Sequence, residues 1–437
     1  MNFTGLLFLL VAQFITGRGL LQLFRLQLSA IAVLCFSMIG GGCIISFAPF
    51  IVQSLGWPLD AAGMYYCISA TTLLCALPLY VYRKSLVRPA FKLPKIYELP
   101  YFAVFAALAS ISVWRCFYYP TTPRDMLTGT ELIAEFAVRE GTLFSSIYNG
   151  LDLRMGPAHN IFKSPFVTGM QVVYKLLVQP FGQVWLSVYA LCFSTWFYTV
   201  ISERVHPVIA GLLMLLLLCA PDLFAYSYIV MYDYISMVFF CAGFYFLTLH
   251  LSSGKLNELA WVSLLFGLAM YLRTETIIFQ GLFIPMLVFR YIKNKLSILQ
   301  ILLRLVVFMV GCLAFQVLGS VLVSAFVPVP LSLQGMINTN FTTIGTVFTK
   351  AVDIAQNRPF FILGEVRLPG QYPYVSGMTP ETAAFPAAAQ LPGMHQLLAA
   401  LGIAWPRTPL NLSVLIALAA AVAVSAFLWR TSAGYEL

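Results

Sequence analysis

Long apolar segments recur along the whole chain, and they constrain its fold more than any other feature. A helix that crosses the roughly 30 Å hydrocarbon core of a bilayer needs about 20 mainly apolar residues. Eleven segments approach this length, although the stretch 257–290 must divide into two short helices. The sequence therefore predicts an all-α integral membrane protein with about 11 transmembrane helices. The segments lie near residues 3–17, 28–54, 61–82, 99–119, 182–202, 207–222, 226–249, 257–272, 274–290, 297–327 and 410–430.

The scarcity of charge supports this class of protein. Charged residues make up 9% of the chain and hydrophobic residues 60%, whereas soluble globular domains contain about 25% charged residues. The net charge of +9 is what cytoplasmic loops of membrane proteins accumulate, so it does not indicate a nucleic-acid partner. The nine cysteines all lie in or beside apolar segments, where they predict neither a disulfide framework nor a zinc site.

The distribution of Lys and Arg predicts the orientation in the membrane. The loop 83–98 carries five basic residues and one acid, which places it on the cytoplasmic side. Counting spans from that loop puts 120–181 and 328–409 outside, as two large extracytoplasmic loops. A bacterial inner membrane is the expected location. The chain then divides into N-terminal helices with the basic loop (1–98), a transmembrane core that includes the first outer loop (99–327), the second outer loop (328–409), and a last helix with a short tail (410–437).

The first outer loop begins with the most charged stretch of the chain, "RDMLTGTELIAEFAVREGTLF" (124–144). It contains four acids and two arginines. Thr128 and Glu131 have the spacing of a capping box, so a helix should begin there, and Gly141 is suited to end it. The pattern predicts an amphipathic helix at the membrane surface. Its apolar face would consist of Leu132, Ile133, Phe136 and Ala137.

The acidic residues of this stretch have different expected roles. Glu131, Glu135 and Arg139 are typical of a solvated helix face, with the last two spaced i,i+4, although Glu131 is also a candidate for lining a substrate cavity. Asp125 precedes the helix, and neither solubility nor helix capping requires a carboxylate there. An Asx-turn is the ordinary alternative for Asp125, and a catalytic role is the functional one.

Two further sites place charge among apolar residues. In "MYLRTETIIFQG", Arg273 and Glu275 lie between two short apolar segments, and a snorkelling Arg paired with Glu275 is the simple interpretation. In "YSYIVMYDYISM", Asp233 lies within the predicted span 226–249, next to Tyr232 and among other tyrosines. Ionisable residues within a span are costly and often functional. Asp233 is either a structural carboxylate held by tyrosines or a contact for a substrate.

These features together resemble the GT-C superfamily of polytopic membrane glycosyltransferases, over roughly residues 100–330. The resemblance rests on the early outer acid, the amphipathic helix ending in "REG", the later "KSPF", and "YLRTE", which is similar in placement to the "TRPEG" of many bacterial sequences. This chain has Thr274 where that motif usually has Pro, and it lacks the adjacent acidic pair of several branches.

The resemblance implies transfer of a sugar from a polyprenyl phosphate or diphosphate to an acceptor on the extracytoplasmic side. Asp125 would be the base that deprotonates the acceptor, and Glu275 would take the place of the Glu in "TRPEG". Cations would hold the lipid phosphate as it leaves. The phosphate-binding candidates are Arg273, Lys163, Arg124 and Arg154, with Arg273 and Lys163 ranked highest because both lie near the membrane plane.

No obligatory metal is expected, although some oligosaccharyltransferase relatives need a divalent ion. His159 and Asp152 are close in the sequence and both are residue types that bind metals, but two ligands without a third do not make a metal site. His159 therefore remains a weaker cavity candidate. The expected partners are a polyprenyl-phosphate-linked sugar, the lipid bilayer and a glycan, lipid or protein acceptor, in the assembly of cell-envelope glycans or glycolipids. The alternatives are a polymerase or ligase of surface polysaccharide, a secondary transporter or flippase of lipid-linked sugars or of another substrate, and a non-catalytic assembly subunit.

Overall fold

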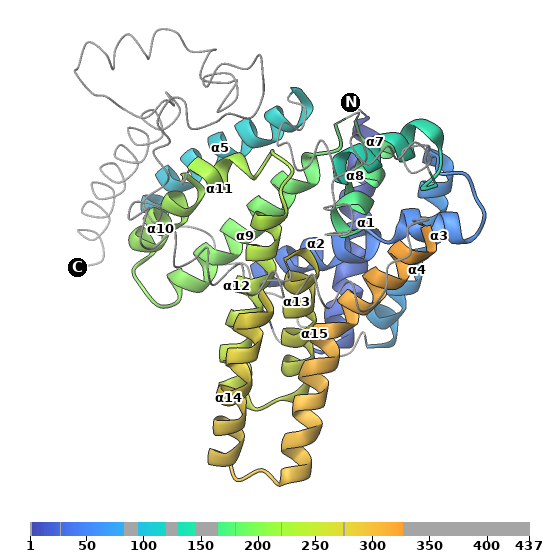
Figure 1. Cartoon of the computed structure of the whole chain (residues 1–437). Coiled ribbons are helices and arrows are strands. Elements are labelled where there is room, and N and C mark those ends of the chain that lie inside the picture. The colour runs from blue at the N-terminus through green and yellow to red at the C-terminus, as the bar shows by residue number, and fades with distance from the viewer. Residues whose placement is uncertain are drawn as a thin grey trace, which may run out of the picture. The chain divides into compact units, whose positions relative to one another are not determined.

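The computed structural model describes residues 2–26, 28–82, 95–118, 130–144, 165–179, 181–219, 221–273 and 276–326. Within these ranges all regular structure is helical and there is no strand (Figure 1). The chain divides into two compact units. Unit 1 comprises 1–92, 109–200 and 225–344, and unit 2 comprises 93–108, 201–224 and 345–437.

Most helices coincide with the predicted apolar segments, but the first runs from Phe3 to Leu23 where the sequence predicted 3–17. Seven helical stretches in the described ranges are long and apolar enough to cross a membrane, so the chain is an all-α, multi-pass membrane protein. The predicted division of 257–290 is confirmed by two helices of 17 residues each. The predicted total of about eleven spans includes 410–430, which lies outside the described residues. The helices are α1 (Phe3–Leu23), α2 (Ala30–Ile45), α3 (Ala48–Ser54), α4 (Ala61–Val81), η2 (Ile96–Glu98), α5 (Leu99–Tyr118), α7 (Thr130–Glu140), α8 (Pro165–Leu177), α9 (Val184–Ser202), α10 (Pro207–Cys219), α11 (Pro221–Ala225), α12 (Tyr232–Ser253), α13 (Leu256–Leu272), α14 (Ile277–Lys293) and α15 (Ile298–Phe326).

Close approach of backbones holds the N-terminal helices of unit 1 together. A Cβ atom on Gly17 of α1 would lie 1.8 Å from the Ser37 carbonyl oxygen of α2, and one on Gly41 would lie 1.8 Å from the Gln13 carbonyl oxygen. Only glycine fits at both positions. In a bilayer, where lipid tails are as apolar as leucine, such close packing is a main source of helix association.

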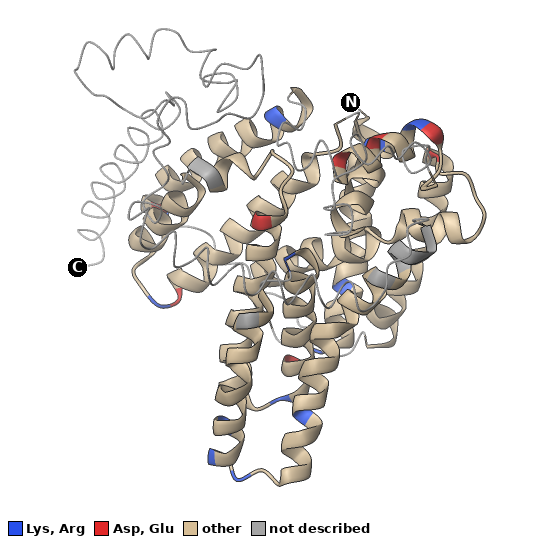
Figure 2. Ribbon diagram, viewed as in Figure 1, with Lys and Arg blue, Asp and Glu red and all other residues tan. Residues whose placement is uncertain are grey.

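Helices α12 and α13 form an antiparallel hairpin in unit 1. Gly254 joins the helices with φ +71, a left-handed conformation that suits glycine. The chain therefore returns, and the start of α12 meets the end of α13. At the opposite end, the turn between α14 and α15 carries Lys293 and Lys295, and Figure 2 shows only basic residues coloured in that turn. The sequence prediction assigns this turn to the cytoplasmic side.

The amphipathic helix predicted in the first outer loop is present as α7, and Gly141 follows it with φ +68, as expected for a glycine stop. Its buried face differs from the prediction. Ile133 and Ala137 are buried, but Leu132 and Phe136 are only half-buried, while Thr130, Glu131 and Ala134 are buried instead. The reason is that α7 packs against α8, which is itself buried along nearly its whole length. Thus α7 is docked onto the protein through a partly polar face.

Unit 2 is small in its described part. The ring of Tyr97 in η2 stacks on His206 just before α10, with centroids 5.7 Å apart. Further along, Gly211 of α10 lies against Tyr101 at the start of α5. Both contacts are aromatic and local.

Candidate functional site

An ion pair lies where α12 begins and α13 ends. Asp233 stands in the first turn of α12, and Arg273 is the residue that caps the C-terminus of α13. The Arg273 guanidinium pairs with the Asp233 carboxylate, and the side chains are 29% and 38% exposed. An aspartate in a first helical turn is also favoured by the helix dipole. Asp233 is therefore held in place by its position in the helix, and both side chains of the pair remain partly exposed to solvent.

The structure refines the sequence interpretation of these residues. Asp233 lies within an apolar helix long enough to span a membrane, as predicted, but in its first turn, because the helix begins at Tyr232 and not near residue 226. Arg273 pairs with Asp233 of another helix, a contact that the sequence interpretation did not include. Glu275, the partner expected from the sequence, lies outside the described residues. Tertiary contact between helices decided the pairing, and spacing along the chain could not reveal it.

A second, more buried charge cluster joins α7 to α8. The Lys175 Nζ lies 2.8 Å from Glu131 Oε1 and 2.8 Å from Glu135 Oε2. The Lys175 side chain is only 3% exposed and that of Glu131 only 10%. The solvated-face interpretation of Glu131 is therefore wrong. This carboxylate points into the protein because a lysine 44 residues further along the chain neutralises it there.

Gln171 completes the surroundings of Glu131. Its Nε2 donates to Glu131 and to the carbonyl oxygen of Phe181, at 3.2 Å for the latter, while its Oε1 accepts from the indole Nε1 of Trp185 at 2.8 Å. Because both ends of the amide have partners, its orientation is fixed. Lys175 and Gln171 lie on one face of α8 at i,i+4 spacing, so α8 presents a cation and an amide to the same carboxylate.

The outer part of this cluster, Glu135 and Arg139, is exposed to solvent, as the sequence predicted. Arg139 Nη2 lies 3.3 Å from Glu135 Oε1, and its side chain is exposed. Partial burial alone would raise the pKa of the Glu135 carboxyl, but hydrogen bonds and attraction from Lys175 and then Arg139 outweigh it, so the pKa lies below its usual value. Glu135 is thus held ionised by two cations. Figure 2 shows the charged positions of α7 as a group on an otherwise mostly tan ribbon.

A hydrogen bond links the two charged regions. The Tyr232 hydroxyl and Thr130 Oγ1 share it, and both side chains are buried. Tyr232 precedes Asp233, and Thr130 precedes Glu131. The start of α7, the inner face of α8, the start of α12 and the end of α13 therefore meet at one end of unit 1. Of the residues singled out in the sequence, this site brings together Glu131, Tyr232, Asp233 and Arg273.

The remaining predicted residues lie outside the described part of the chain. They are Asp125, Arg124, Arg154, His159, Lys163 and Glu275. Within the described ranges, no group of three or more His, Cys, Asp or Glu side chains is placed to hold a metal ion.

Three polar residues of this end were missed by the sequence interpretation. Lys175 and Gln171 stand alone in the apolar helix α8, and Arg115 stands alone near the end of α5. The Arg115 guanidinium is buried and lies over the ring of Tyr228, 5.0 Å from its centroid. The available signal was the same in each case: an isolated polar or basic residue in an apolar segment usually has a buried partner or a function.

The arrangement provides accessible and buried charges for different tasks. Arg273 is partly exposed and can offer its planar donor fork to a phosphate while Asp233 holds it. Glu131 is buried and neutralised by Lys175, which suits a structural carboxylate better than a base.

Comparison of the chain with protein-family models, with curated proteins and with solved structures finds no match.

Proposed function

We propose that the protein is a membrane glycosyltransferase that moves a sugar from a polyprenyl phosphate or diphosphate to an acceptor on the extracytoplasmic side. The observation that supports this most is the position of Arg273. It is a partly exposed arginine at the end of a membrane helix, oriented by Asp233. It also falls in "YLRTE", the segment in which the chain resembles the GT-C superfamily.

In this proposal Arg273 contacts the lipid phosphate. The leaving phosphate gains negative charge as the glycosidic bond breaks, and a guanidinium already in place stabilises that charge without reorganising. The ion pair with Asp233 holds the guanidinium in one orientation. Lys163, Arg124 and Arg154 are the proposed additional phosphate contacts, with Glu275 and His159 as further residues of the substrate cavity.

Asp125 is the proposed base. An acceptor hydroxyl must lose its proton as it attacks the sugar carbon, and a carboxylate can accept it. Glu131 is poorly suited because Lys175 and Gln171 already occupy its two oxygens. Asp125 comes only five residues before Thr130 in the sequence. The reaction needs no cofactor in this scheme.

Reconstitution tests the proposal. Purified protein in phospholipid vesicles is offered a panel of polyprenyl-phosphate and polyprenyl-diphosphate sugars labelled in the sugar, together with lipid and glycan acceptors. Transfer of label to an acceptor, with release of the polyprenyl phosphate, supports a glycosyltransferase. Counterflow of the labelled donor between leaflets without any cleavage of the sugar–phosphate bond would instead identify a transporter or flippase and overturn the proposal.

A further inference from the structure

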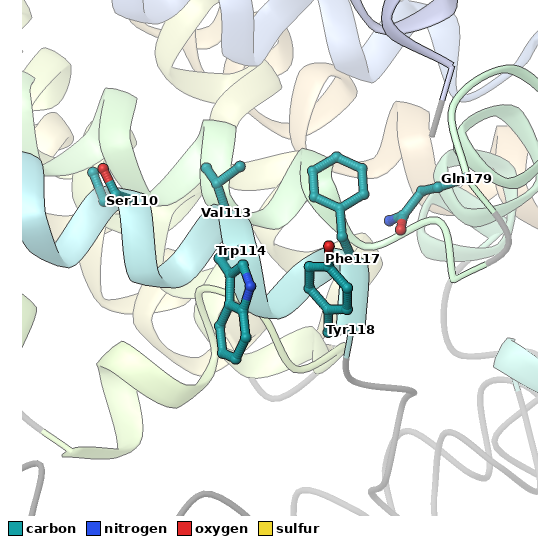
Figure 3. Close-up of a pocket in the computed structure, with 7 residues that line it drawn as sticks. Ser110, Val113, Trp114, Phe117, Tyr118 and Gln179 are labelled. Atoms are coloured by element: carbon teal, nitrogen blue, oxygen red, sulfur yellow. The ribbon is translucent and has the colours of Figure 1, made fainter.

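A hollow of about 640 Å³ opens beside the C-terminal half of α5, a volume in the range of small-molecule sites, which is about 300–1,000 Å³. We call it the α5 groove. Its lining shares no residue with the charged site, and three of the lining residues are aromatic. The side chains labelled in Figure 3 are Ser110, Val113, Trp114, Phe117, Tyr118 and Gln179.

Helical periodicity explains why these residues face the groove. Ser112 and Cys116 of α5 turn inward, where Ser112 Oγ lies 2.8 Å from Ser187 Oγ of α9 and Cys116 Sγ lies 3.1 Å from the same hydroxyl. Residues at the spacing of Trp114 and Tyr118 therefore point away from α9. Their rings lie side by side with centroids 5.3 Å apart, tilted by 36°. Both rings are exposed.

Gln179 supplies the second observation. It is only 5% exposed, yet neither its amide oxygen nor its amide nitrogen has a hydrogen-bond partner within the described part of the chain. Figure 3 shows the amide directed toward Phe117 and Tyr118. A buried amide without partners is costly and is uncommon in folded proteins. A ligand that brings both a donor and an acceptor would satisfy it.

We propose that the α5 groove binds a sugar ring of the glycan acceptor, with a pyranose face stacked on Trp114 and Tyr118 and a hydroxyl bonded to Gln179. A pyranose has an apolar face of C–H groups, which packs on the negative face of an aromatic ring, and hydroxyls that donate and accept. A lipid tail would satisfy the rings but leave the amide unpaired. This inference deepens the proposed function, since a glycosyltransferase needs a place for its acceptor.

Binding of simple sugars tests the inference without requiring turnover. The full-length protein is placed in phospholipid nanodiscs, which carry no sugar headgroup, and is offered methyl glucoside, methyl mannoside and methyl galactoside. Saturation-transfer NMR should show contact with the ring C–H protons, because that face is shared by pyranoses. Trp114→Ala should weaken binding by about fivefold to tenfold. The matched control is Trp57→Ala, since Trp57 is 46% exposed and Trp114 48%, and it should leave binding unchanged.

A second variant separates binding from folding. Gln179→Leu removes the unpaired amide at similar volume, so it should keep or raise the thermal unfolding midpoint while weakening sugar binding. No saturation transfer from any of the three glycosides, or equal transfer in the Trp114 and Trp57 variants, would overturn the inference and identify Trp114 as a membrane anchor only. That result leaves the proposed transfer reaction intact, whereas sugar binding without any donor cleavage would count against the reaction alone.

Discussion

The ammonium of Lys175 lies 2.8 Å from the carboxylate of Glu131, and both side chains are almost fully buried. This contact fixes the polar helix α7 to the apolar helix α8. Removing one member of a buried pair leaves an uncompensated charge, which costs about 3–5 kcal/mol. The pair therefore determines whether the outer helix stays docked.

Lys175→Met should lower the free energy of unfolding by about 3–5 kcal/mol. The double variant Lys175→Met with Glu131→Gln should recover part of that loss, since no buried charge then remains unpaired. Unfolding in mixed micelles, followed by circular dichroism, measures both. Lys293→Met, at an exposed lysine, is the control and should change little. A single variant as stable as wild type would show that the pair does not hold α7.

Arg273→Ala should weaken binding of a polyprenyl-phosphate sugar by about tenfold or more, because a charged hydrogen bond to phosphate is lost. Arg273→Lys should bind at an intermediate level, since lysine keeps the charge but lacks the planar fork. Arg139→Ala removes an exposed arginine outside the proposed phosphate contacts and serves as the control. Donor affinity measured by calorimetry that is equal in all four proteins would remove Arg273 from the phosphate site.

The ion pairs of Glu135 should make stability depend on acid pH. Its pKa is lowered in the folded protein from an ordinary value of 4.5, so its stabilising contribution is present above that ordinary value and is lost as pH falls through the folded value. The unfolding midpoint of wild type should exceed that of Glu135→Gln near neutral pH. The difference should shrink below about pH 4.5. A difference that stays constant, or grows, in acid would contradict this assignment.

Gly41→Ala should disrupt the contact of α1 with α2, since the added Cβ would meet the Gln13 carbonyl at 1.8 Å. A backbone atom cannot move aside as a flexible side chain can, so a fall in the thermal midpoint is expected. Gly281→Ala in α14 is the matched control, because nothing lies within 4 Å of its Cβ position. It should be neutral or stabilising by up to about 1 kcal/mol. Equal midpoints for the two variants would mean that the close approach is not present in the membrane.

The fold was largely readable from the sequence because bilayer thickness sets the length of an apolar helix. The start of the first span at residue 3, the division of 257–290 and the glycine stop at Gly141 all reflect such local rules. The start of α12 was misplaced because Tyr226 to Met231 are as apolar and aromatic as the helix that follows. Composition alone does not mark a turn in that stretch.

The site was less readable, since its contacts join residues far apart in the chain. Arg273 was identified from a resemblance and Asp233 from its unusual setting, but their pairing depends on how α12 and α13 return on each other. Glu131 fitted a solvated face until Lys175 and Gln171 of α8 were placed beside it. Helical periodicity gives the face of one helix and does not say which other helix will cover it.

The most direct test of the proposed reaction compares Asp125→Asn with wild type in reconstituted vesicles, with labelled polyprenyl-phosphate sugar and acceptor at saturating levels. The substitution removes the base while keeping the size of the side chain. We expect donor binding to be retained and transfer to fall by about 100-fold or more, the usual contribution of general base catalysis. Transfer at the wild-type rate would contradict Asp125 as the base and, with it, the central claim about how this protein works.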